Sequence, residues 1–130
     1  MGEAMADNVK AMLAAANAAV PRVSAAEARA MIAKDNPLIL DVRDGTEVQQ
    51  SGKVKGAVHV SRGLVEFRAD PESPAYNAAF QKDRPVIVYC ASGGRSALAG
   101  KTLKDMGYAK VFNLGGFKDA VDGGLPTEPA

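Results

Sequence analysis

Residues 85–96 read Pro-Val-Ile-Val-Tyr-Cys-Ala-Ser-Gly-Gly-Arg-Ser and begin with the strongest strand signal of the chain. Its first part, Pro85 to Tyr89, is β-branched and aromatic, which predicts a strand. Cys90 and two glycines follow, and a helix is predicted from about Arg95 to Met106, where Gly107 ends it as a C′ glycine. A strand that leads through a glycine-rich loop into a helix is typical of an α/β protein.

Shorter strands and helices are predicted around this unit. Leu38–Val42 is a continuous apolar run, which is typical of a strand buried on both faces of a parallel sheet. Two capping boxes, Ser24 with Glu27 and Asp44 with Glu47, each predict the start of a helix. The remaining predictions are strands at 57–60 and 111–114, a short helix at 117–121, and a loop at 61–84 with one or two short helical pieces. Together they predict one α/β domain whose central, mainly parallel sheet has about five strands, with helices on both faces.

The two ends of the chain are predicted to differ. Residues 5–20 carry apolar side chains at spacings of three and four, and Pro21 ends this amphipathic helix. Such a helix serves either as a docking or dimer helix or as a helix packed on its own domain, and we favour the second. Glycines and prolines from Gly123 onward predict a frayed tail. The apolar positions of the helix are Met5, Val9, Met12, Leu13, Ala16 and Val20.

Composition excludes several classes of function. The chain has 130 residues and a formal net charge of +1, and 47% of its residues are hydrophobic. This indicates one globular domain and argues against a nucleic-acid binder, which would carry a basic excess. No run approaches the ~18 apolar residues of a membrane span. Residues 1–7 lack the basic and apolar regions of a secretory signal, so we expect a cytoplasmic protein without membrane attachment.

The single cysteine and the single histidine narrow the chemistry further. Cys90 alone cannot form an internal disulfide or a CxxC redox pair, and a zinc site of Cys90, His59 and carboxylates is improbable. His59 lies in an apolar run and is interpreted as a satisfied core or edge histidine. Covalent chemistry would therefore use Cys90 without a general-base histidine, and no metal or cofactor is expected.

The segment from Cys90 to Ser96 is the candidate site. Ligands of open parallel sheets bind beyond the carboxyl ends of strands, where this loop must lie. Its glycines allow backbone N–H groups to form an anion-binding nest, and the following helix adds its positive N-terminal end. Both features, with the charge of Arg95, predict a thiol pKa below the free value of ~8.5. The alternative is that Cys90 is a small buried apolar residue before an ordinary turn.

The pattern of motifs resembles the rhodanese-like sulfurtransferase family over Val23–Pro126. The loop Cys90-x-x-Gly-x-Arg-Ser96 is similar to the active-site loop of that family, and Asp41-Val-Arg43 is similar to part of its first signature. We accordingly divide the chain into an N-terminal helix (1–21), a rhodanese-like domain (22–126) and a tail (127–130). The further residues that carry the resemblance are Leu40, Glu47, Gly52, Gly56, Ala57, Gly107, Tyr108, Val111, Leu114, Gly115, Gly116, Gly124, Leu125 and Pro126.

The resemblance implies that Cys90 accepts a sulfane sulfur as a persulfide and passes it to cyanide, a thiol or a protein acceptor. Substrate binding is assigned to Ala91, Ser92, Gly93, Gly94, Arg95 and Ser96. Asp41 and Arg43 are expected to support the loop, and an i, i+4 pair between Arg43 and Glu47 is a structural alternative. Arg62 is expected either at the mouth of the pocket or as a solvated loop charge.

Departures from the family pattern leave the identity of the sulfur donor open. Ala91 and Ser92 are neutral where the thiosulfate-using enzymes of the family have a second cationic residue. The competing functions are a phosphatase or arsenate reductase on the same scaffold and a non-enzymatic persulfide carrier. Related phosphatases have five residues between the cysteine and the arginine, whereas four separate Cys90 from Arg95, so sulfur transfer is favoured.

Overall fold

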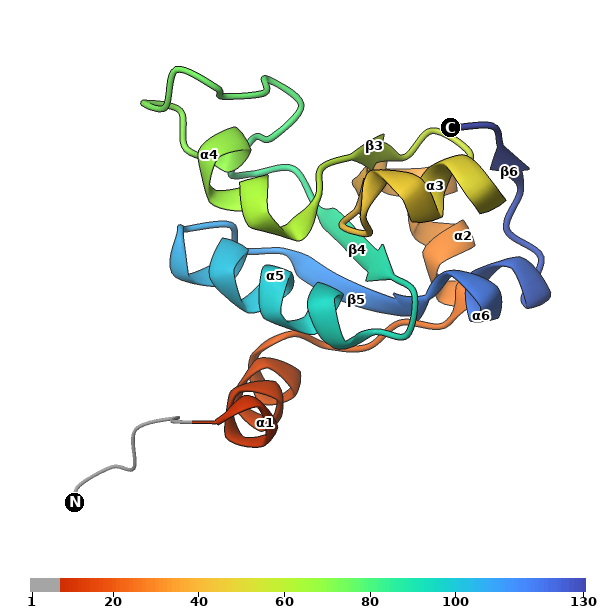
Figure 1. Cartoon of the computed structure of the whole chain (residues 1–130), viewed down its shortest axis with the longest axis horizontal. Coiled ribbons are helices and arrows are strands. Elements are labelled where there is room, and N and C mark those ends of the chain that lie inside the picture. The colour runs from red at the N-terminus through yellow and green to blue at the C-terminus, as the bar shows by residue number, and fades with distance from the viewer. Residues whose placement is uncertain (1–7) are drawn as a thin grey trace.

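The computed structural model describes residues 8–130 and places a four-stranded sheet at the centre of the molecule (Figure 1). Its strands, in spatial order, are β3 (Val58–His59), β1 (Leu38–Asp41), β4 (Val86–Cys90) and β5 (Val111–Gly116), and all neighbours are parallel. The predicted α/β class with a mainly parallel sheet is confirmed. The central sheet has four strands rather than about five, because β2 (Lys53–Val54) pairs only with β6 (Thr127–Glu128), in a separate antiparallel sheet.

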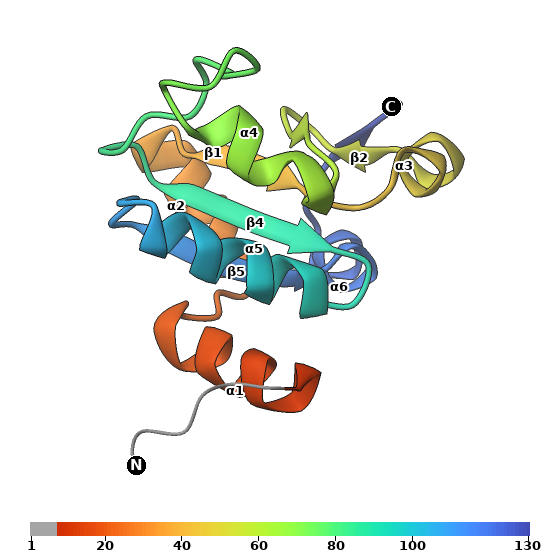
Figure 2. The same ribbon diagram turned by 60° about the vertical axis from the view of Figure 1, so that its left-hand side comes forward.

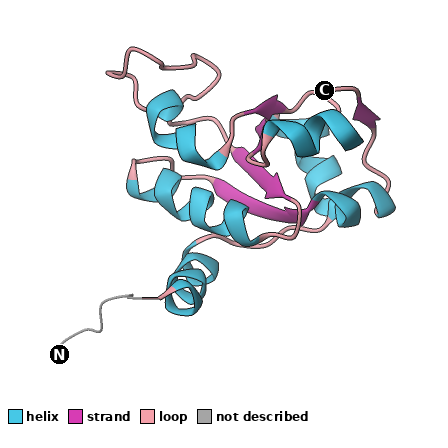
Figure 3. Ribbon diagram, in the orientation of Figure 1, coloured by secondary structure: helices cyan, strands magenta, loops and turns pink. Residues whose placement is uncertain are grey.

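Helices cover both faces of the sheet, as Figures 2 and 3 show. The helices are α1 (Val9–Ala19), α2 (Ala25–Asp35), α3 (Gly45–Ser51), α4 (Val65–Ala69), α5 (Gly94–Asp105) and α6 (Phe117–Asp122), with a 3₁₀ turn, η1 (Arg62–Leu64), before α4. The connection from α4 to β4 is the long loop in Figure 3, and with η1 and α4 it matches the prediction for residues 61–84.

Both capping boxes form as predicted, and they fix where α2 and α3 begin. The Glu27 N–H donates to Ser24 Oγ at 3.0 Å, and the Ser24 N–H donates to Glu27 Oε1 at 2.8 Å. At the start of α3 the Asp44 N–H donates to Glu47 Oε1 at 2.9 Å. These bonds satisfy N–H groups that a helix start leaves without partners.

Alternate residues of the strands face opposite sides of the sheet, which gives the protein two cores. On one side Val88 and Cys90 pack with Leu103 of α5 and with residues of α4. On the other side Ile87 and Tyr89 pack with buried residues of α2 and α6. Cys90 therefore belongs to the α4–α5 side of the sheet, and its neighbour Tyr89 belongs to the α2–α6 side.

The first helix lies against α5 (Figure 2), and only part of its predicted apolar face is buried. Ala16 and Val20 are buried, and a Cβ atom at Gly100 of α5 would lie 3.1 Å from Val20 Cγ1. Val9 and Met12 were expected on the same buried face, yet their exposures are 62% and 44%. The middle of the helix also reaches α5, since a Cβ atom at Gly94 would lie 3.9 Å from Leu13 Cδ2, whereas Met5 lies outside the described residues.

The frayed tail predicted from Gly123 onward is wrong, because part of this segment forms a strand. Thr127 and Glu128 form β6, and Glu128 holds this strand in place with its side chain. Its Oε2 atom accepts a hydrogen bond from Lys53 Nζ at 2.5 Å and one from the Gly56 N–H at 3.0 Å. In the described part of the chain, no helix has the length and apolar character needed to cross a membrane.

Candidate active site

Cys90 is the last residue of β4, and its side chain lies against the start of α5. The residue is fully buried, whereas Ala91 and Ser92 of the following loop are exposed. The loop turns back at Gly93, whose φ of +103° lies in the left-handed region that glycine adopts freely. This turn directs the Gly93 N–H at Cys90 Sγ, 3.0 Å away.

Hydrogen bonds to the sulfur favour the thiolate form of Cys90. Burial raises the thiol pKa, but hydrogen bonds from the Ser96 hydroxyl and from the backbone N–H groups of Ser96, Gly93 and Ser92 outweigh it. The Ser96 hydroxyl lies 3.4 Å from Sγ. The net effect is a pKa below the ordinary value, in the direction that the sequence predicts. No histidine contributes to this activation.

Asn113 of β5 organises the loop, and sequence reasoning missed it. Its Oδ1 atom accepts hydrogen bonds from the Ser96 hydroxyl at 2.8 Å and from the Gly115 N–H at 2.9 Å, and its Nδ2 donates to the Gly93 carbonyl at 3.2 Å. The residue is almost fully buried. The sequence does hold one signal for Asn113, because it is a single amide residue inside the apolar strand Val-Phe-Asn-Leu. A buried amide side chain needs hydrogen-bond partners inside the protein.

The two glycines at the end of β5 allow the loop to approach the strand. A Cβ atom at Gly116 would lie 2.6 Å from the Ala91 carbonyl oxygen, which is closer than any real contact. Gly115 has a φ of +93°, and a Cβ atom there would lie 2.4 Å from Nη2 of Arg22. The resemblance marked both glycines, and the structure gives the steric reason for them.

The Arg95 side chain is paired with a carboxylate of α3. Its two terminal nitrogens donate to the two carboxylate oxygens of Glu47 at 2.7 and 3.0 Å, and Asp44 Oδ2 lies 3.9 Å from Nη1. The hydrogen bonds with Arg95, reinforced by the Asp44 N–H, lower the pKa of Glu47 to about 2. The alternative pair between Arg43 and Glu47 does not form, because Glu47 pairs with Arg95 and Arg43 pairs with Asp41.

Asp41 and Arg43 form a buried ion pair on the α2–α6 side of the sheet. Arg43 Nη2 lies 2.7 Å from Asp41 Oδ2, and Arg43 Nε donates to Asp41 Oδ1 at 3.0 Å. The Tyr89 hydroxyl also donates to Asp41 Oδ2, at 2.7 Å, and burial raises the pKa of that tyrosine. The Arg43 guanidinium covers the ring of Phe117 at 4.3 Å. This network touches the residue before Cys90, not the sulfur.

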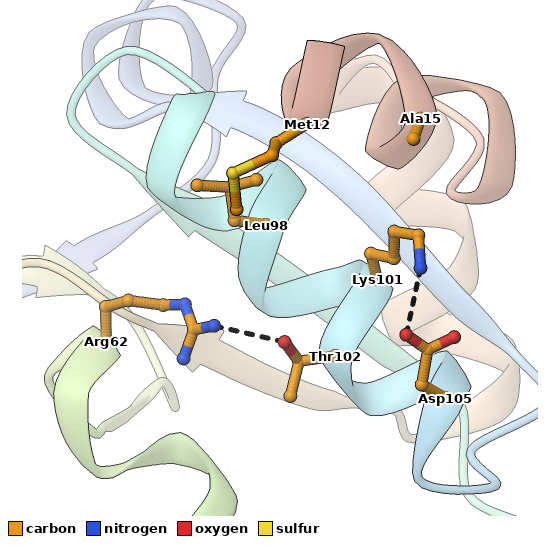
Figure 4. Close-up of a pocket in the computed structure, with 7 residues that line it drawn as sticks. All are labelled: Met12, Ala15, Arg62, Leu98, Lys101, Thr102 and Asp105. Carbon is orange, nitrogen blue, oxygen red and sulfur yellow. Dashed lines mark hydrogen bonds and ion pairs between the residues drawn. The ribbon is translucent and has the colours of Figure 1, made fainter. Parts of the chain in front are cut away.

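Arg62 lies in a different hollow from the Cys90 loop (Figure 4). Its Nη2 donates to Thr102 Oγ1 and its Nη1 to Glu66 Oε1, both at 3.0 Å. The hollow lies between α1, α5 and η1, and no residue from 90 to 96 lines it. The remaining residues around it are Met12, Ala15, Leu98, Lys101 and Asp105. Arg62 is therefore neither at the Cys90 pocket nor a free solvated charge.

A second hollow adjoins the Cys90 loop at Ala91. Arg43, Glu47, Phe117 and Lys118 are among the residues that line it, so it brings the turn after β1, helix α3 and helix α6 to the same edge as the loop. His59 is half-buried, and its Nε2 lies 2.6 Å from the Arg43 carbonyl, as expected for a satisfied histidine. Across residues 8–130, no three His, Cys, Asp or Glu side chains gather in a way that could hold a metal ion.

Comparison with known proteins places the chain in a family. The model of the rhodanese-like domain family matches residues 24–122. A thiosulfate sulfurtransferase, GlpE of Actinobacillus succinogenes, is 33% identical over 102 residues, which are 77% of this chain and 83% of that protein. YrkF of Bacillus subtilis is 31% identical over 96 residues, and the match covers 47% of its length, so this chain spans about half of that relative.

Solved structures of other proteins are also similar to this chain over most of its length. A Rhodopseudomonas palustris protein, described as of unknown function and a possible tyrosine phosphatase, is 40% identical with a TM-score of 0.86, and the match covers 98% of this chain and 99% of that one. The homodimeric polysulfide-sulfur transferase of Wolinella succinogenes is 32% identical with a TM-score of 0.73, covering 93% and 87%. With the family model spanning most of its length, this chain belongs to the rhodanese-like domain family.

Proposed function

We propose that this protein is a sulfurtransferase that carries a sulfane sulfur as a persulfide on Cys90. The observation that supports it most is the set of donors around Sγ: the Gly93 N–H at 3.0 Å and the Ser96 hydroxyl at 3.4 Å. Donors fixed before the reaction stabilise negative charge on sulfur without reorganisation. They favour the thiolate that attacks the sulfur donor and that is regenerated when the sulfur is passed on.

The proposed reaction has two balanced steps. The Cys90 thiolate attacks the outer sulfur of thiosulfate, an S–S bond forms to Cys90, and sulfite leaves with the electron pair of the broken S–S bond. Cyanide or a thiolate then attacks the terminal sulfur, which regenerates the Cys90 thiolate and releases thiocyanate or a new persulfide. Because Cys90 is buried, we propose that donor and acceptor approach past the exposed residues Ala91 and Ser92.

The proposed donor class is an anion that carries sulfane sulfur. GlpE is named for thiosulfate and the Wolinella protein for polysulfide, and both are anions with a transferable sulfur. Sulfur transfer requires no metal or cofactor, since the sulfur already has the oxidation state in which it leaves. We propose a cytoplasmic protein, with cyanide, a small thiol or a protein thiol as acceptor.

Phosphatase chemistry is the second candidate, because the similar Rhodopseudomonas palustris protein is described as a possible tyrosine phosphatase. Arginine binds phosphate through a bidentate pair of N–H groups. Here both terminal nitrogens of Arg95 donate to Glu47, so the N–H groups that would bind a phosphate are already engaged by a carboxylate. With four residues between Cys90 and Arg95, this pairing favours transfer of a single sulfur atom.

The experiment compares both activities in the same preparation. The wild-type protein is assayed for thiocyanate formation from thiosulfate and cyanide and for hydrolysis of an aryl phosphate, beside Cys90→Ser. We expect thiocyanate formation that depends on Cys90 and negligible release of phosphate. Robust phosphate release that depends on Cys90 would reverse the ranking. Stoichiometric sulfur loading without turnover would favour the alternative of a persulfide carrier.

Assembly into a homodimer is a further part of the proposal. The Wolinella protein is a homodimer, and its match covers 93% of this chain. Val9 and Met12 of α1 are exposed apolar side chains that a second copy would cover. Sedimentation analysis of the wild type and of Val9→Glu tests this: the wild type should sediment as a dimer and the variant as a monomer. A monomeric wild type would contradict it.

A further inference from the structure

We infer that Arg22 supplies the cationic charge with which the Cys90 loop selects anionic reactants. This inference names a specificity residue for the proposed sulfur transfer and rests on it for the identity of the donor. Arg22 lies two residues before the stretch that the family model matches, and it belongs to the segment between α1 and α2.

The backbone of Arg22 is fixed beside β5. Arg22 forms a parallel bridge with Asn113, where the Asn113 N–H donates to the Pro21 carbonyl at 2.8 Å and the Val23 N–H donates to the Asn113 carbonyl at 3.0 Å. Asn113 is the residue whose side chain holds the Cys90 loop. The segment that carries Arg22 is therefore tied to the same strand position that organises the site.

The side chain of Arg22 reaches over the two glycines that flank the loop. A Cβ atom at Gly115 would lie 2.4 Å from Arg22 Nη2 and 2.9 Å from Cζ, so the guanidinium occupies the space that a side chain would take. A Cβ atom at Gly93 would lie 3.9 Å from Arg22 Nη1. Because the Gly93 N–H is 3.0 Å from Cys90 Sγ, ordinary bond lengths place Nη1 within about 10 Å of the sulfur.

The cations around the site differ in their partners. Arg43 is paired with Asp41, Arg95 with Glu47, and Lys118 with Asp122. Within residues 8–130, no hydrogen bond or ion pair engages the Arg22 side chain, which is exposed to solvent. Arg22 is thus a cation beside the loop whose charge no carboxylate of the described residues neutralises.

An unneutralised positive charge at this distance acts on anions that approach the sulfur. Thiosulfate carries two negative charges and brings them to a loop whose residues Ala91 and Ser92 are neutral. Attraction over about 10 Å near a surface changes affinity by roughly three- to tenfold at low ionic strength. It fades in high salt, because the Debye length is only ~3 Å at 1 M.

Alkylation tests this inference without requiring sulfur transfer. Iodoacetate and iodoacetamide react with a thiolate by the same chemistry but differ by one negative charge, and Cys90 is the only thiol in the chain. The ratio of their rates on Cys90 is measured for the wild type, Arg22→Gln and Arg22→Lys. Arg68→Gln, an equal change of charge on an exposed residue of α4, is the matched control.

We expect the iodoacetate-to-iodoacetamide ratio to fall roughly two- to threefold in Arg22→Gln at low salt, since iodoacetate carries half the charge of thiosulfate, and to stay near wild type in Arg22→Lys and Arg68→Gln. The KM for thiosulfate should rise roughly three- to tenfold in Arg22→Gln, with kcat changed much less. An unchanged ratio in Arg22→Gln overturns the inference. If the ratio falls but the wild type transfers no sulfur, selection of anions by Arg22 is supported and the proposed function fails.

Discussion

The Arg95 guanidinium and the Glu47 carboxylate form a bidentate ion pair, with N–O distances of 2.7 and 3.0 Å, that joins the start of α5 to α3. The pair engages both terminal nitrogens of the arginine in the Cys90 loop. The hydrogen bonds that lower the Cys90 pKa come instead from backbone N–H groups of the loop and from the Ser96 hydroxyl.

The Glu47–Arg95 pair should make stability depend on pH in the acid range. The pKa of Glu47 is lowered from 4.5 to about 2, so its stabilisation is complete above about pH 4.5 and is lost as the pH falls toward 2. Because the pair is partly exposed, its contribution is at most about 1 kcal/mol. Urea unfolding of the wild type and of Glu47→Gln should show a gap in stability that narrows between pH 5 and pH 3. Glu66→Gln is the control, and a gap that is constant with pH would contradict the prediction.

The buried pair between Asp41 and Arg43 should matter far more. Asp41→Asn removes the carboxylate charge and leaves a buried guanidinium unneutralised, which costs about 3–5 kcal/mol. Asp122→Asn makes the same chemical change in the exposed pair with Lys118, where solvent screens the charges, and should cost far less. Chemical denaturation of both variants measures the contrast. Equal losses would show that burial does not decide the contribution of this pair.

The Ser96 hydroxyl should help to hold the Cys90 thiolate. Ser96→Ala deletes a donor 3.4 Å from Sγ and a bond to Asn113 Oδ1, so the thiol pKa should rise. The rate of alkylation by iodoacetamide, followed against pH, should have its midpoint at higher pH than in the wild type. Ser61→Ala, which deletes a hydroxyl outside the loop, should leave the midpoint unchanged. A midpoint that stays in place or falls in Ser96→Ala argues against this role.

The close approach of the loop to β5 should make Gly116 intolerant of a side chain. In Gly116→Ala the new Cβ atom would lie 2.6 Å from the Ala91 carbonyl oxygen, so the loop must shift, at a cost of about 1–3 kcal/mol. Sulfur loading of Cys90 should slow as well. Gly63→Ala is the matched control, because no atom lies within 4 Å of a Cβ built there. Unaltered stability and loading in Gly116→Ala would show that the loop yields without cost.

The strand, loop and helix from residue 85 to 106 could be predicted because their signals are local. An apolar run, a pair of glycines and a terminating glycine lie next to one another in the sequence, and so do the capping boxes of α2 and α3. Lowering of the Cys90 pKa followed from the same local geometry, since the N–H groups come from the loop itself. The α/β class followed from the alternation of strands and helices.

Contacts between distant segments could not be predicted in this way. Asn113 contacts the loop from another strand, and Glu47 pairs with Arg95 although the two residues are 48 positions apart in the sequence. β6 forms because the fold brings the C-terminal segment beside β2. The glycines and prolines of that segment, taken alone, predict an irregular tail. Arg22 gave no signal, because only the bridge to Asn113 brings it to the loop.

Sulfur carried on Cys90 changes the mass of the protein, so intact mass spectrometry detects it. Incubation of the wild type with thiosulfate should add ~32 Da, the mass of one sulfur, and cyanide or dithiothreitol should remove it. Because the chain has one cysteine, the position of the adduct is unambiguous, and Cys90→Ser should gain no mass and form no thiocyanate. Thiocyanate formation by Cys90→Ser at the wild-type rate, or a wild-type protein that never gains the sulfur, would contradict the account.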